Sequence, residues 1–202
     1  MHTKIPELIN KGSSGWNFQG ILRMDLHTTK FKALHGKGWV ALPDELANEK
    51  AIINPQNEDN RCFEWACIAA VAPSSLKNTQ RVTVLAKVDH QLDFSKLESS
   101  VQLNKIAAFE RKNKHTVQVY EYDDDGARPV HLGDRVVGQP VIKLLLYESH
   151  FMTIKNFSRF VGQETTHGGN HKTHYCDYCL TAYPSHAKLD WHVDNGCQLI
   201  TT

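Results

Sequence analysis

The five cysteines fall into two groups whose spacing could carry two different chemistries. One group, Cys176, Cys179 and Cys197, joins His192 in the pattern Cys-x2-Cys-x12-His-x4-Cys. Two thiolates at this spacing suit the tip of a β-hairpin, and the following histidine and cysteine suit the end of a helix. The four can therefore close a tetrahedron around one ion. We expect a Cys-Cys-His-Cys zinc finger of ββα type, with zinc as a structural cofactor.

The residues around these ligands support a finger but leave its role open. Tyr183 and Leu189 stand where a small core under the metal would lie. A DNA-reading finger would present Trp191 to bases, but a single finger spans only about three base pairs. Asp190 and Asp194 also oppose contact with phosphate. The alternatives are a folding staple, a protein-binding module and a contact to nucleic acid.

Cys62 is the candidate nucleophile in the other group. It follows a polar loop and opens an apolar segment, and the free N–H groups at a helix start favour a thiolate. His150 is the best-placed general base, because it begins a predicted strand directly after a tight turn. Gln56, six residues before Cys62, could complete an oxyanion hole with the Cys62 N–H. Trp65 is expected to be a packing residue that could also line the cleft. Cys67 lies inside the apolar run and is expected in the core.

Three side chains could orient the imidazole of His150. Asn156 is favoured, although six residues of extended strand span about 20 Å, so the chain would have to bend between the two. Glu148 and Asp59 are the other candidates. A packing role for Cys62 and His150, as a small core residue and a strand-edge histidine, is the alternative to catalysis.

The hydrophobic pattern places helices before strands and predicts an α+β fold with a central helix on an antiparallel sheet. Short strands and turns are expected within residues 1–49. Helices are expected over 43–47, 62–71 and 102–113, and strands over 116–122, 128–132, 141–147 and 150–155. A polar, Gly/His/Thr-rich linker, 162–174, separates a predicted main domain, 1–161, from the finger, 175–202.

The composition narrows the class of protein. The 202 residues are 41% hydrophobic and carry a net charge of +1, which excludes disorder throughout and binding of polyanions by bulk charge alone. No apolar run approaches the roughly 18–20 residues of a membrane span, and the first residues lack a signal-peptide core. We therefore expect an intracellular protein with no membrane contact, and a monomer.

Two short motifs resemble cysteine peptidases. Gln56-x5-Cys62 followed by Phe-x-Trp is similar to the papain-like arrangement of oxyanion glutamine, nucleophile and aromatic residue. The string DNRCF at 59–63, with His150-Phe151 later in the chain, resembles the boxes of ovarian-tumour-type deubiquitinases, but Asn60 stands where that family has Gly. Glu148-x-His150 resembles the Asp-x-His order of herpesvirus tegument-type deubiquitinases.

The chain as a whole, over roughly residues 12–197, resembles the N-terminal segment ahead of the protein-primed DNA polymerase of Maverick/Polinton-type transposons. The strings that carry this resemblance are LPDELANEKAIINPQNEDNRCFEW, KIAAFERKN, HFMTIKNFSRF and the finger itself. The resemblances imply a papain-like cysteine peptidase or isopeptidase, in its sharpest form a deubiquitinase whose partner is ubiquitin or a ubiquitin-like protein. The alternative is a non-catalytic module of a transposon polymerase that binds protein or nucleic acid through its finger.

Overall fold

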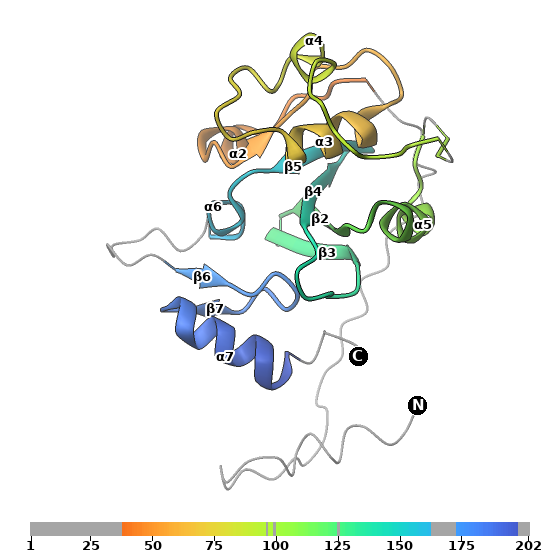
Figure 1. Cartoon of the computed structure of the whole chain (residues 1–202). Coiled ribbons are helices and arrows are strands. Elements are labelled where there is room, and N and C mark those ends of the chain that lie inside the picture. Colours follow the sequence, from red (N-terminus) through yellow and green to blue (C-terminus); the bar gives the residue numbers. More distant parts are fainter. Residues whose placement is uncertain (1–37, 96, 99, 125, 163–172, 198–202) are drawn as a thin grey trace, which may run out of the picture. The chain divides into compact units, whose positions relative to one another are not determined.

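A five-stranded sheet crossed by one buried helix is the framework that positions the candidate site (Figure 1). The computed structural model describes residues 38–95, 97–98, 100–124, 126–162 and 173–197, so the strands and turns predicted before residue 38, and most of the predicted linker, lie outside the described residues. The strand order is β1-β5-β4-β2-β3. The strands are β1 (Ile52–Ile53), β2 (Thr116–Asp123), β3 (Gly126–Leu132), β4 (Val141–Tyr147) and β5 (His150–Ile154).

Six helices accompany the strands in the described part of the chain. They are α2 (Asp44–Asn48), α3 (Cys62–Val71), α4 (Val82–Leu85), α5 (Leu103–Asn113), α6 (Phe157–Val161) and α7 (His186–Gly196). A separate two-stranded sheet, β6 (His174–Tyr175) with β7 (Ala182–Tyr183), precedes α7. The predicted α+β class is therefore confirmed. None of the described helices is long and apolar enough to cross a membrane.

The prediction of a wholly antiparallel sheet is wrong at one pair. β2 and β4 run parallel, with Val119 opposite Leu144, whereas the other neighbours are antiparallel. The reason is the path between them. β3 returns along the outer side of β2, and the following loop brings the chain back to the start of β2, where Pro140 accepts a hydrogen bond from the N–H of Thr116. β4 therefore starts at the same end as β2, as a parallel neighbour requires.

Helix α3 is buried because it is apolar on nearly all sides. Ala66 and Cys67 face β4 and β5, and Trp65 and Ile68 face α4. The helix ends at Val71, just before Ala72 turns extended ahead of Pro73 in the sequence. Its first residue is therefore held at one end of the sheet by packing along its whole length.

Phe63 is the centre of the core under α3. Its ring meets Phe109 of α5 and Phe151 of β5 edge to face, at centroid distances of 5.3 and 5.2 Å. Phe94 stacks on Phe109 at 5.2 Å. Such pairs are favourable beyond the apolar area that they bury, so this cluster fixes α3 against the start of β5.

The turn between β4 and β5 fixes where His150 begins. Glu148 and Ser149 both have positive φ, 47° and 67°, and Tyr147 is opposite His150 across them. Two left-handed residues are the requirement of a type I′ hairpin turn. The tight turn predicted at these positions is therefore confirmed.

Replacing Phe63 by alanine removes two aromatic contacts and leaves a cavity, so we expect the free energy of unfolding to fall by about 3–5 kcal/mol. Chemical denaturation followed by circular dichroism measures the change. Val137→Ala is the control, because that side chain is 99% exposed, and it should leave the midpoint unchanged. Equal midpoints for wild type and Phe63→Ala would contradict this account of the core.

Candidate functional site

His150 is fully buried and hydrogen-bonded to Asn54. Its Nε2 lies 3.1 Å from Asn54 Oδ1. The orientation of that amide is set independently, because Asn54 Nδ2 donates to the carbonyl oxygen of Val40 at 2.8 Å, and a carbonyl can only accept. The amide oxygen must then face the ring and accept from Nε2–H. In the neutral imidazole the basic lone pair is consequently on Nδ1.

Asn54 was not among the residues predicted from the sequence, and it directly follows the apolar residues Ile52 and Ile53 of β1. Ninety-six residues separate it from His150, and the two meet because β1 and β5 are neighbours in the sheet. The one signal available was a polar residue directly after an apolar run, which is common at strand ends and names no partner.

The structure gives Asn156, the preferred orienting residue, a local role at the start of α6. Asn156 begins α6, and its Oδ1 accepts from the N–H of Arg159 at 3.1 Å, so it serves as a helix cap. The short helix α6 was not predicted, because its five residues are too few to show a period. Glu148 lies in the β4–β5 turn with positive φ. The contact seen at His150 Nε2 is with Asn54.

Cys62 is the first residue of α3, as predicted, but its side chain is only 2% exposed. Burial raises the pKa of the Cys62 thiol, although backbone hydrogen bonds from Phe151, Phe63 and Cys62 itself favour the thiolate. The expectation of a lowered pKa is thus wrong for the chain without ligand. Desolvation outweighs the helix N-terminus at this depth.

The Cys62 thiol contacts the backbone edge of β5, at the N–H of Phe151, and does not lie over either face of the strand. The N–H of Lys155 donates to the carbonyl of Ala51, so alternate N–H groups of this segment point toward β1. The N–H of Phe151 points the same way, and β1 pairs with β5 only as far as Ile53 opposite Thr153. Cys62 therefore occupies the edge that β1 leaves at the start of β5.

The two faces of β5 separate the ring from the helix. Phe151 packs against α3, and Thr153 Oγ1 donates to the carbonyl of Ala66 at 2.6 Å. Met152 and Ile154 pack on the opposite side. Strand alternation puts His150 with Met152 and Ile154. For the imidazole to take a proton from Cys62, it must reach across the end of the strand.

The loop before α3 is organised by Asp59. Its carboxylate accepts from the N–H of Arg61 at 3.0 Å and from Trp65 Nε1 at 3.2 Å. Its neighbour Asn57, which is buried, donates to Asp59 as well. Trp65 is 6% exposed and packs beside α4, as expected of a packing residue, and its role in binding substrate stays a prediction. Asp59, one of the candidates for orienting the ring, instead fixes the turn that leads into the helix.

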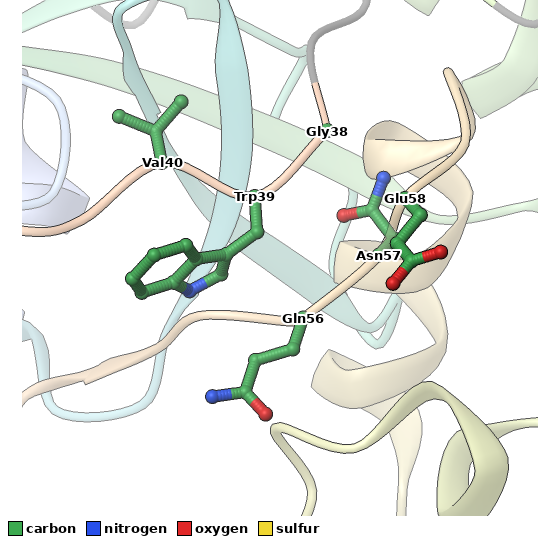
Figure 2. A pocket seen from close by; sticks show the side chains of 6 residues that line it. All are labelled: Gly38, Trp39, Val40, Gln56, Asn57 and Glu58. Atoms are coloured by element: carbon green, nitrogen blue, oxygen red, sulfur yellow. The ribbon is translucent and has the colours of Figure 1, made fainter.

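Gln56 is exposed and lines two cavities. One, of about 690 Å³, lies between the segments 38–40 and 56–58, which are joined by the Trp39 N–H and the Asn57 carbonyl at 2.8 Å (Figure 2). Figure 2 shows the Gln56 side chain directed away from Asn57 and Glu58. The second cavity also contains Gln56 and Trp39. The predicted oxyanion role of Gln56 stays a prediction.

The four predicted metal ligands converge on one point. Their ligand atoms all lie within 4.8 Å of one another, with 3.6 Å between the sulfurs of Cys176 and Cys197 and 3.3 Å between Cys179 Sγ and His192 Nε2. Tetrahedral coordination at ordinary bond lengths puts two sulfurs about 3.8 Å apart and sulfur and nitrogen about 3.6 Å apart. The cluster can therefore hold one metal ion.

The thiol of Cys176 must lose its proton to bind a metal ion. Burial raises the pKa of this thiol to about 12, so the ion would have to displace a tightly held proton. Tyr183 stacks on the ring of His192 at 4.8 Å, and Leu189 packs against the ligands from α7. The small core predicted under the metal is confirmed.

The turn between Cys176 and Cys179 forms hydrogen bonds and an ion pair with residues of the main domain. The hydroxyl of Tyr120, fully buried on β2, donates to the carbonyl of Asp177. Lys143 of β4 lies 2.8 Å from the Asp177 carboxylate, and Tyr178 donates to the carbonyl of Gly133 at 3.1 Å. The metal cluster therefore stabilises a turn that packs against β2 and β4.

Comparison of the chain with protein-family models, with curated proteins and with solved structures found no match.

The burial of Cys62 predicts a distinctive pH dependence of alkylation. Because the thiolate is the reacting form and burial raises its pKa, the rate with iodoacetamide should be low at pH 7.5 and still rise above pH 9. Mass spectrometry of the Cys62 peptide measures the rate, with a short peptide of the same local sequence as the unburied reference. A plateau already reached below pH 8 would contradict the raised pKa.

The cluster geometry predicts one bound metal ion per chain. Cys197→Ser should abolish binding, as measured by elemental analysis of the purified chain. It should also lower the melting temperature of the whole described fold by at least about 5 °C, because the docked turn loses its anchor. Cys67→Ala is the control, since Cys67 is buried outside the cluster and should leave the metal content at one. Full metal content in Cys197→Ser would rule out this ligand set.

Proposed function

We propose that the chain is a cysteine peptidase or isopeptidase of papain-like architecture, with Cys62 as nucleophile and His150 as general base. Asn54 replaces Asn156 as the residue that orients the ring. The observation that carries the proposal is the hydrogen bond between His150 Nε2 and Asn54 Oδ1, which leaves the basic lone pair on Nδ1. This pair stands at the start of β5, where the next N–H, that of Phe151, meets the Cys62 thiol.

The reaction uses the resting protonation state described above. As substrate binds, Nδ1 of His150 takes the proton from Cys62 Sγ, and the thiolate attacks the carbonyl carbon of the scissile amide. The Cys62 N–H and Gln56 stabilise the resulting oxyanion. The intermediate collapses to a thioester as the imidazolium protonates the leaving amine. Water, deprotonated by the same ring, then hydrolyses the thioester and restores the thiol.

The substrate class comes from the resemblance to ovarian-tumour-type and tegument-type enzymes. We propose that the chain acts inside the cell and that its partner and substrate is ubiquitin or a ubiquitin-like protein. The metal of the finger is zinc, because three thiolates and one imidazole in a closed tetrahedral set are typical of structural zinc sites. Its part is to hold the turn at Asp177 and Tyr178 against the sheet.

A second candidate function is supported by the burial of the thiol and the ring. With Cys62 at 2% and His150 at 0% exposure, both could be core residues of a non-catalytic module. In that case the finger would make the contacts with the binding partner. Trp191 is 69% exposed on α7 and would meet protein or nucleic acid, while Asp190 and Asp194 are exposed on the same helix.

A ubiquitin with an electrophile at its C-terminus distinguishes the two candidates. We expect a covalent adduct at Cys62 that disappears in Cys62→Ala and remains in Cys67→Ala, as seen by intact-mass spectrometry. Asn54→Ala should slow adduct formation by roughly 10-fold or more, because the ring loses the bond that fixes its tautomer. Circular dichroism of each variant separates loss of reactivity from loss of fold.

Two outcomes of this experiment would contradict the proposed hydrolase. An adduct of equal yield in wild type and Cys62→Ala, or no adduct with any probe, would remove the hydrolase. Salt-sensitive binding to DNA that is lost in Cys176→Ser would then favour the binding module.

A further inference from the structure

A second cavity lies beside β1, at the edge of the sheet. It measures about 830 Å³ and is lined by Ile52 and Ile53 of β1, by Asn54, and by the loop 74–80 that follows α3. Asn54 is the partner of His150, so one wall of the cavity is in direct contact with the proposed catalytic ring. Gln56 lines it as well.

The charged side chains that line this cavity are all positive. Lys50, Lys77 and Lys155 line it, and no aspartate or glutamate is among its described lining residues. All three lysines are exposed, and none forms an ion pair with another described residue. The whole chain carries a net charge of only +1, so this concentration of positive charge is local. Unpaired cations around a cavity favour an anionic ligand.

The backbone in the cavity suits an extended ligand. β1 is an edge strand, and among the described residues it pairs with β5 alone. Edge strands present backbone groups that an incoming peptide can pair with in register. Beyond β1 the edge is closed again, because the Gln56 N–H donates to the carbonyl of Gln80 at 2.7 Å.

We propose that the cavity beside β1 binds the extended tail of the substrate, and that this tail carries acidic side chains. Lys50, Lys77 and Lys155 would pair with the carboxylates, and the tail would run along β1 toward Asn54. The inference rests on the proposed function and narrows the class of substrate. Among ubiquitin-like modifiers and peptides, it favours those with an acidic tail over those with a basic one, and it therefore disfavours ubiquitin itself, whose C-terminal tail carries arginines.

A peptide fits the observations better than a single-stranded nucleic acid, which would also meet three lysines. Binding of single strands depends on a row of aromatic residues that stack with successive bases. Trp39, 49% exposed, is the one aromatic side chain among the described lining residues. The edge strand, by contrast, offers an alternation of N–H and C=O groups that matches another extended peptide backbone.

Binding can be measured without catalysis in the full chain bearing Cys62→Ala. The probe is a fluorescein-labelled decapeptide that alternates glutamate with valine, followed by fluorescence anisotropy. We expect it to bind at least about tenfold more tightly than the same peptide with arginine in place of glutamate. Adding Lys50→Ala, Lys77→Ala and Lys155→Ala together should weaken binding at least about tenfold and reduce its dependence on salt. Adding Lys87→Ala, Lys105→Ala and Lys188→Ala, three exposed lysines outside the cavity, removes the same charge and should change affinity less than twofold.

Equal loss of affinity in both triple variants, or equal binding of the glutamate and arginine peptides, would overturn the proposal. So would a decathymidine that binds through the same three lysines while the glutamate peptide does not bind. These binding results do not depend on the reaction with the electrophilic ubiquitin. Selective peptide binding with no adduct at Cys62 would remove the hydrolase and keep the acidic-peptide site, whereas an adduct without selective binding would do the reverse.

Discussion

The start of β5 is the constraint on which the candidate site depends. Its backbone edge is left open because β1 pairs no further than Ile53 opposite Thr153. The Cys62 thiol occupies that edge through the N–H of Phe151, and the ring of His150, one residue earlier, is held by Asn54. The two-residue turn at 148–149 fixes the register of both. A shift of one residue would exchange the faces of His150 and Phe151 and break both arrangements.

The features that the sequence predicted are those that local pattern determines. The buried helix at 62–71, the amphipathic helix at 103–113 and the hairpins on either side of 124 and 148 follow from period and turn residues. The parallel pairing of β2 with β4 and the contact between Asn54 and His150 depend on residues far apart in the chain. The sequence carries no local mark of either. Asn156 was favoured because it lies in the string HFMTIKN and has the same strand parity as His150, whereas its local role is to cap α6.

In the metal cluster, too, one part follows from local sequence pattern and another depends on residues far apart in the chain. Four ligands within 22 residues were predictable from spacing alone, since the metal imposes the geometry. The attachment of the cluster to the sheet was not predictable, because Tyr120 reads as an ordinary strand residue. Its buried hydroxyl finds a partner in Asp177, 57 residues later. The turn between Cys176 and Cys179 thus offers the buried Tyr120 hydroxyl an acceptor in addition to Gln118 Oε1.

Burial of the ring and its orientation have a common cause. The bond from Asn54 Nδ2 to the Val40 carbonyl fixes the amide that holds His150, and the Trp39 N–H bonds to the Asn57 carbonyl beside it. The segment that supplies Val40 therefore both sets the tautomer and lies against the residues that follow β1, at Asn54 and Asn57. An imidazole with a defined basic nitrogen is obtained at the expense of solvent access. A substrate that approached along the exposed side of β1 would reach Asn54 without first opening the core around Phe63.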